Sequence, residues 1–206
     1  MIRVKICGIT NGRDARGAVA SGADALGFVF ADSPRRADEK IVAKIVRGLG
    51  KKVAAIGVFV DEPPERLFRI AESCALNMLQ FHGQEKPALI RKAQRRGFQV
   101  LKAVRVGEKE NFKKLSDDPA DAWLFDTSVS GRFGGTGKTF DWEILKNRSF
   151  DRPWFVSGGL NAHNVKKLLS TLRPYGVDVS SGVENAPGKK NHKLVKEFIR
   201  NAKSAG

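Results

Sequence analysis

Two residues with reactive side chains lie where apolar runs of this sequence end. Cys7 ends the run Arg3–Cys7, and Asp126 ends the run Ala122–Asp126. A thiol becomes reactive when it is accessible and its surroundings tune its pKa. A carboxyl group against an apolar wall has its pKa raised by desolvation, which suits a general acid. Both positions are therefore candidates for chemistry, and the structural alternatives are a buried thiol and an aspartate that caps a turn or helix.

Other polar or small residues also follow apolar runs. They are Asp61, His82, Ser157-Gly158-Gly159, and Ser180-Ser181-Gly182 just after Asp178. Small residues in two neighbouring loops let backbone N–H groups approach the oxygens of a phosphate. We therefore expect a phosphate to bind between these two loops, which follow the last two predicted strands. Asp61 is followed closely by Pro63 and Pro64, and is expected to cap a helix.

The histidines and cysteines do not predict a metal site. His82, His163 and His192 are scattered, and Cys7 and Cys74 are the only cysteines. Two distant cysteines form neither a disulfide framework nor a CxxC metal site. We therefore expect no metal and no cofactor, and we interpret Cys74 as a packed core thiol.

Short β-rich runs alternate with helical patterns along the whole chain. The strand candidates are Arg3–Cys7, Ala25–Phe30, Val53–Val60, Met78–His82, Gln99–Val104, Ala122–Asp126, Trp154–Ser157 and Val177–Ser180. Apolar stripes at helical spacing follow several of them, including Ile41–Leu49, Val165–Leu172 and Leu194–Ile199. Eight βα units predict a single-domain (β/α)8 TIM barrel over residues 1–206, with a doubly wound sheet as the alternative. A helix is also expected around Glu108–Leu115.

Local signals mark the ends of these elements. Thr10 or Asn11 is expected to cap the first helix, and Asn161 the helix that contains His163. Gly22, Gly97 and Gly176 lie between a helix and the next strand, which predicts left-handed caps.

The charge is high but dispersed. The 206 residues carry a formal net charge of +15, which favours anionic partners such as phosphorylated metabolites. Basic residues fall mostly on the polar faces of predicted helices and are not interleaved with stacking aromatics. We therefore expect a small phosphorylated substrate, with no nucleic-acid partner. With no signal peptide or long apolar run, the predicted location is the cytoplasm and no membrane partner is expected.

The stretch from Gly134 to Thr139 is similar to a nucleotide-binding P-loop. That pattern, GxxxxGK[ST], requires its first glycine at position 132, where this sequence has Arg132. We therefore interpret the stretch as a flexible active-site loop over an anionic substrate.

Eight segments, in order along the chain, resemble the phosphoribosylanthranilate isomerase family. They are Lys5–Thr10, Gly22–Phe30, Gly57–Val60, Gln80–Gly83, Phe125–Thr127, Gly134–Trp142, Ser157–Leu160 and Asp178–Glu184. The strings KICGIT, GGTGKTFDW and DVSSGVE are the most specific, and the resemblance spans essentially the whole chain.

The resemblance implies a cofactor-free Amadori rearrangement in tryptophan biosynthesis, catalysed by a monomer or homodimer. Cys7 would be the general base and Asp126 the general acid. Asp178 would bind the sugar hydroxyls and His82 would contact substrate. The phosphate would be held by Gly158, Gly159, Ser180, Ser181 and Gly182. An arginine would bind the anthranilate carboxylate, and here both Arg35 and Arg36 follow Ser33-Pro34.

Two other functions are alternatives. Indole-glycerol-phosphate synthase and tryptophan synthase α are sister barrels that would need a catalytic Lys–Glu or Glu–Asp set at the strand ends. Lys5 and Lys102 are available, but no predicted strand ends in a glutamate. A nucleic-acid-binding protein would need a basic stripe, which the scattered charge does not form.

Overall fold

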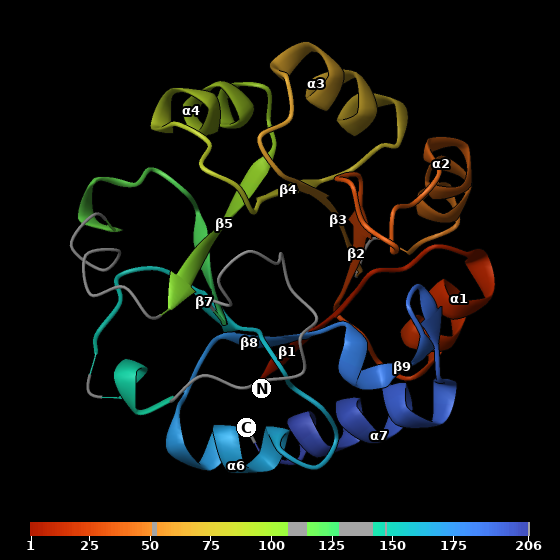
Figure 1. The fold of residues 1–206 in the computed structure, drawn as a ribbon, viewed down its shortest axis with the longest axis vertical. Coiled ribbons are helices and arrows are strands. Elements are labelled where there is room, and N and C mark those ends of the chain that lie inside the picture. The colour runs from red at the N-terminus through yellow and green to blue at the C-terminus, as the bar shows by residue number, and fades with distance from the viewer. Residues whose placement is uncertain (51–52, 107–114, 128–141, 147, 206) are drawn as a thin grey trace.

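The computed structural model describes residues 1–50, 53–106, 115–127, 142–146 and 148–205. Eight parallel strands close into a barrel in chain order, with the helices around the outside (Figure 1). The predicted (β/α)8 barrel is therefore confirmed.

The strands follow the apolar runs closely. They are β1 (Arg3–Cys7), β2 (Ala25–Val29), β3 (Ala54–Phe59), β4 (Met78–Phe81), β5 (Gln99–Val106), β6 (Ala122–Thr127), β7 (Trp154–Val156) and β8 (Gly176–Val179). Each lies within two residues of its predicted bounds. A parallel strand covered by helices outside and packed inside must be apolar on both faces, and this requirement makes such runs easy to recognise.

The helices that cover the barrel are α1 (Gly12–Ala20), α2 (Glu39–Arg47), α3 (Pro64–Ser73), α4 (Pro87–Arg95), α6 (Val165–Thr171) and α7 (His192–Lys203). The described parts of the β5–β6 and β6–β7 connections contain only 3-10 turns, Leu115–Asp117 and Trp142–Leu145. The predicted helix at 108–115 lies outside the described residues except for Leu115. The glycine-rich loop at 134–139 also lies outside them. No helix in the described segments is long and apolar enough to cross a bilayer.

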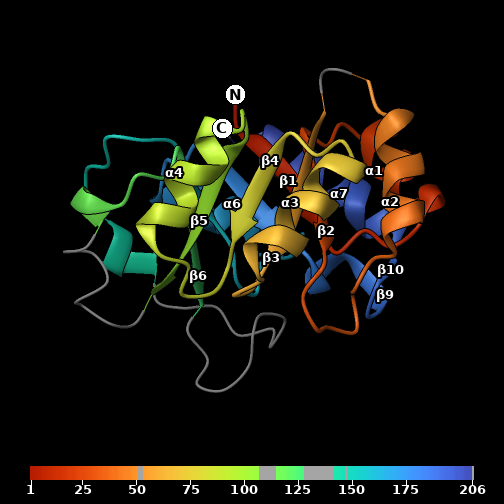
Figure 2. The same ribbon diagram turned by 90° about the horizontal axis from the view of Figure 1, so that it is seen from above.

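A short hairpin follows β8. After the 3-10 turn Ser181–Val183, β9 (Glu184–Ala186) pairs antiparallel with β10 (Lys189–Lys190). It lies at the same end of the barrel as the loop that follows β2 (Figure 2).

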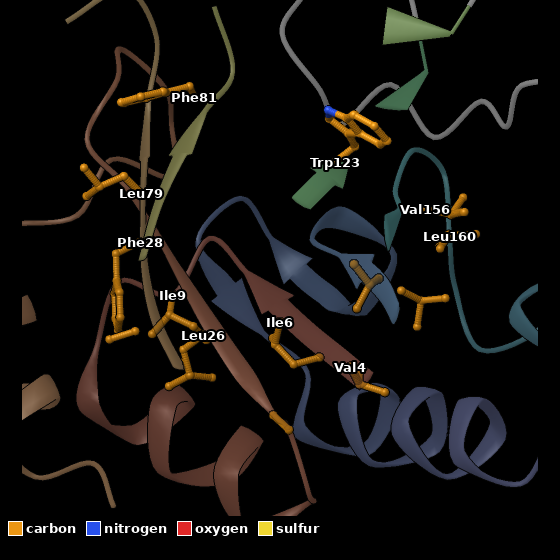
Figure 3. Packing of buried hydrophobic residues seen from close by; sticks show 14 of the residues in the cluster. Val4, Ile6, Ile9, Leu26, Phe28, Leu79, Phe81, Trp123, Val156 and Leu160 are labelled. Atoms are coloured by element: carbon orange, nitrogen blue, oxygen red, sulfur yellow. The ribbon is translucent and has the colours of Figure 1, made fainter. Parts of the chain in front are cut away.

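Side chains alternate between two sides of each strand. On β1, Val4 and Ile6 join the main hydrophobic cluster between strands and helices (Figure 3). Lys5 and Cys7 therefore face the barrel interior. A second cluster of Leu101, Ala122, Leu124 and Phe155 also comes from alternate strand positions. The same period of two puts Leu124 and Asp126 on one face of β6.

Two predicted side-chain caps have a different position or role. Asp61 does not cap α3, whose N-cap is Pro63; its carboxylate instead accepts a hydrogen bond from Gln84 N at 2.7 Å. Asn164, not Asn161, is the N-cap of α6, so His163 lies in the turn before that helix. In that turn Asn161 Oδ1 accepts from His163 N at 2.9 Å. Both side chains therefore organise loops, a choice that sequence position alone does not distinguish from capping.

Two of the three predicted left-handed glycine caps are confirmed. Gly22 and Gly97 have φ of 98° and 85°, as left-handed caps require. Gly176 does not; it is the first residue of β8, where an added Cβ would lie 2.3 Å from the Phe155 ring. Its small size makes room for a neighbouring aromatic ring.

The predicted cap of the first helix and the predicted core thiol are both confirmed. Asn11 caps α1, accepting from Asp14 N at 2.9 Å. Cys74 is fully buried at the end of α3, as predicted. In α2, Val42 is the buried member of the expected stripe, and Ile41 is 44% exposed because the outer helix layer faces water there.

Candidate active site

A pocket of about 270 Å³ opens at the carboxyl ends of the strands. Its lining includes these residues from the sequence prediction: Cys7, Arg35, His82, Asp126, Gly158, Gly159, Asp178, Ser180 and Ser181. Arg36 and Gly182 are the predicted site residues that are not among the described lining residues. In a parallel barrel all strand ends of one kind meet at one face, so side chains far apart in sequence come together there.

Cys7 reaches the pocket because a glycine lies beside it. It is paired in register with Gly27 of β2, and a Cβ added at Gly27 would lie 2.8 Å from Cys7 Sγ. The residue is 8% exposed. Burial raises the pKa of the Cys7 thiol, and the nearby ammonium of Lys5 opposes that rise.

Asp126 is held by a chain of hydrogen bonds from β4 and the residue after it. His82 Nε2 lies 3.1 Å from Asp126 Oδ2, and Gln80 Nε2 lies 2.9 Å from His82 Nδ1. Gln80 and His82 thus link β4 to the Asp126 carboxyl group through side-chain contacts. The carboxyl group is 5% exposed and faces the pocket. This arrangement orients one oxygen and leaves the group suited to proton transfer.

The loops after β7 and β8 are in close contact. Gly158 and Gly159 have φ of 88° and 64°, values that favour glycine. A Cβ added at Gly182 would lie 1.9 Å from Leu160 O. Only a glycine therefore fits at position 182, where the loop after β8 packs against the loop after β7. Ser180 Oγ is buried and has no hydrogen-bond partner within the described structure.

Arg35 and Arg36 have different surroundings. Arg35 lines the pocket and is half-buried, whereas Arg36 is exposed. Glu184 accepts from Arg35 Nε at 3.1 Å and from Nη2 at 2.9 Å. Lys190 Nζ also binds Glu184, at 2.8 Å. Because the carboxylate occupies the Nε–Nη2 edge of the guanidinium, the Nη1–Nη2 edge can still bind a second carboxylate.

Several residues of the site were missed from the sequence. Gln80 shares the inward face of its strand with His82, a period-two relation that was available as a signal. Glu184 lies in the recognised Asp178–Glu184 segment, but nothing local connects it to Arg35. Lys5 was considered only as a catalytic lysine of a rival barrel. Within the described residues no group of three His, Cys, Asp or Glu side chains is placed to hold a metal.

Comparisons with known proteins identify the family of this chain. The family model described as N-(5'phosphoribosyl)anthranilate (PRA) isomerase matches residues 4–201. An N-(5'-phosphoribosyl)anthranilate isomerase from Pelobacter propionicus is 44% identical over 204 residues, covering 98% of this chain and 96% of the relative.

Two solved structures have the same fold. The phosphoribosyl anthranilate isomerase from Thermotoga maritima superposes with a TM-score of 0.90 at 44% identity, covering 99% of this chain and all of the other. A phosphoribosyl anthranilate isomerase in complex with reduced 1-(o-carboxyphenylamino)-1-deoxyribulose 5-phosphate has a TM-score of 0.87 at 41% identity, with the same coverage. On this evidence the chain belongs to the N-(5'-phosphoribosyl)anthranilate isomerase family.

Proposed function

We propose that this protein converts N-(5'-phosphoribosyl)anthranilate into 1-(2-carboxyphenylamino)-1-deoxyribulose 5-phosphate in tryptophan biosynthesis, with Cys7 as general base and Asp126 as general acid. The observation that carries the proposal is one pocket that holds both residues together with the loops after β7 and β8. It therefore combines two proton-transfer groups with a wall suited to phosphate.

The chemistry moves protons at the ring oxygen and at the neighbouring carbons C1 and C2. Asp126 protonates the ribose ring oxygen, the bond from that oxygen to C1 breaks, and the anthranilate nitrogen forms an iminium with C1. The positive iminium makes the C2 proton acidic, and the Cys7 thiolate removes it to form an enolamine. Return of a proton to C1 and loss of the hydroxyl proton at C2 produce the ketone. C2 is oxidised and C1 reduced within one molecule, so no external oxidant or cofactor is needed.

The substrate has two anionic ends, and residues of the pocket suit both. Its phosphate would lie against Gly158, Gly159, Ser180 and Ser181, small residues whose backbone N–H groups a phosphate can approach. Its carboxylate would bind Arg35 on the edge that Glu184 leaves open. Asp178 also lines the pocket and would accept from a sugar hydroxyl.

The purified protein tests this function directly. Incubation with N-(5'-phosphoribosyl)anthranilate should consume the substrate, as followed by the fluorescence of its anthranilate group. Carbon NMR should show a new ketone carbon in the product. Failure to turn over this substrate, in a protein with a cooperative thermal transition, would reject the proposed reaction.

Arg35→Lys is expected to raise KM by about 10- to 100-fold with a smaller change in kcat. Lysine keeps the charge but loses the planar fork, and a charge-assisted hydrogen bond is worth about 1.5–3 kcal/mol. Steady-state kinetics measure the effect. Arg36→Lys is the matched control and should leave KM nearly unchanged; the reverse pattern would assign the carboxylate to Arg36.

Four expectations from the sequence stay predictions. They are the organisation of residues 1–206 as one domain, a monomeric or homodimeric assembly, a cytoplasmic location, and the lack of a nucleic-acid partner.

A further inference from the structure

Lys5 is a fully buried cation that the proposed reaction does not use. It lies on β1 two residues before Cys7, so both side chains face the barrel interior. Its exposure is 0%, and its ammonium lies 3.0 Å from Asp178 Oδ1. A lysine is almost never fully buried unless it is paired, because its charge loses the solvation of water. The Asp178 carboxylate supplies that pairing and holds the ammonium in place.

The ammonium of Lys5 and the thiol of Cys7 lie beside the same glycine. A Cβ built on Gly27 would be 2.9 Å from Lys5 Nζ and 2.8 Å from Cys7 Sγ. Both atoms therefore border the small space that Gly27 leaves on the neighbouring strand. Backbone register, not loop geometry, sets this arrangement, since Lys5 pairs with Ala25 and Cys7 with Gly27.

We propose that Lys5 is a positioning residue whose ammonium, held by Asp178, stabilises the thiolate of Cys7 during proton abstraction. This role rests on the proposed function of Cys7 as the base. Lys5 is not among the described residues that line the pocket, so it acts on the substrate through the charge that it places next to the sulfur.

The charged groups around Cys7 support this role. Burial lowers the pKa of Lys5, but Asp178 and Cys7 more than offset that effect, so the pKa of Lys5 is raised and the side chain stays an ammonium. For Cys7, burial raises the pKa, Lys5 lowers it, Asp178 raises it and Lys190 lowers it. Lys190 Nζ is already bound to Glu184 and to Ser180 O.

Groups farther from the thiol complete its electrostatic surroundings. Glu184 also binds Arg35, so the two cations Arg35 and Lys190 share one carboxylate near β9. Asp126 and His82 face the same pocket from β6 and the end of β4. Of all these groups, Lys5 is the cation that shares the space beside Gly27 with the sulfur.

The test measures the Cys7 thiol itself, independently of catalysis. In a Cys74→Ala background, Cys7 is alkylated with iodoacetamide at a series of pH values, and the inflection of the rate gives its pKa. Lys5→Met should raise this pKa by about one to three pH units, the shift produced by one close opposite charge. Lys102→Met, which removes a lysine paired with Glu85 at 2.7 Å, should leave it unchanged.

A second variant separates Lys5 from Asp178. Lys5→Met alone leaves a buried carboxylate unpaired, which both destabilises the fold and repels a thiolate. Lys5→Met/Asp178→Asn removes both charges, and the pKa of Cys7 should still lie above that of the parent. An unchanged or lower pKa in this double variant would overturn the proposal, even if the single variant cannot be purified.

Activity distinguishes this proposal from the one on which it rests. If Lys5 supports the base, Lys5→Met should lower kcat/KM at neutral pH as the alkylation pKa rises, because a smaller fraction of Cys7 is then thiolate. If Lys5→Met shifts the alkylation pKa but Cys7→Ser is fully active, Lys5 does influence the Cys7 thiol, and Cys7 is rejected as the base. A normal alkylation pKa with a lowered kcat/KM would overturn the role of Lys5.

Discussion

The Cys7→Ser variant is expected to keep its fold and to lose isomerase turnover by about 10²–10⁴-fold, the range that a general acid–base group contributes. A serine hydroxyl occupies nearly the same space but gives up its proton far less readily than a thiol. Because Cys7 is 8% exposed and ends a core strand, circular dichroism and thermal unfolding must accompany the kinetics.

The second cysteine supplies a matched control for this substitution. Cys74 is also buried, but it ends α3 in the outer layer and lies 3.4 Å from Glu39 O. Cys74→Ser should therefore cost some stability and leave kcat unchanged. Parent-like turnover in Cys7→Ser would remove Cys7 from the mechanism.

The pH profile gives the same substitution a second readout. Burial raises the pKa of Cys7 despite Lys5, and the ordinary thiol value is about 8.5. The thiolate form of Cys7 therefore increases with pH, and the rate at which iodoacetamide alkylates Cys7 should rise from neutral into alkaline solution. In Cys7→Ser this thiol-dependent rise should be lost.

The Asp126→Asn variant is expected to lose turnover by about 10²–10⁴-fold while keeping the pocket intact. Asparagine keeps an oxygen that can accept from His82 Nε2, so the contact at 3.1 Å can persist. Its amide cannot deliver an acidic proton to the ring oxygen, so ring opening should become rate-limiting. Steady-state kinetics and thermal unfolding of the same preparation check both statements.

A carboxylate at the other end of the same strand controls for the change in charge. Asp121 lies just before β6 and accepts from Val100 N at 2.7 Å, away from the pocket. Asp121→Asn should lower stability modestly and keep kcat, because the amino ends of barrel strands serve stability. If Asp126→Asn were as active as Asp121→Asn, another group would have to protonate the ring oxygen.

Much of the fold was predictable because the information is local. Each strand needs a short run of apolar residues, and each helix needs a stripe at helical spacing. Once eight such units alternate, the carboxyl ends of all strands must meet at one face. For this reason the positions of Cys7 and Asp126, which lie 119 residues apart in sequence, indicated a shared site before any contact was known.

Sequence patterns predicted the role of a residue less well where the residue could serve either as a cap or in a contact with a distant segment. Asp61 before two prolines has the pattern of a cap, yet its side chain binds the backbone of the loop after β4. Gly176 has the position of a left-handed cap, yet it makes room for Phe155 from the neighbouring strand. In both cases a partner distant in sequence decided between two equally allowed local roles.

The sequence by itself therefore determined the barrel and the face on which the candidate site lies, and the tertiary structure decided how the charges of that face are paired. Lys5 meets Asp178 across 173 residues, and Arg35 meets Glu184 across 149. Barrel closure brings β1 beside β8, and the hairpin of β9 and β10 beside the loop after β2. These pairings depend on strand register and side-chain direction, which no local sequence pattern encodes. A buried charge is stabilised by an opposite charge close to it, and only the closed barrel decides which residue that is.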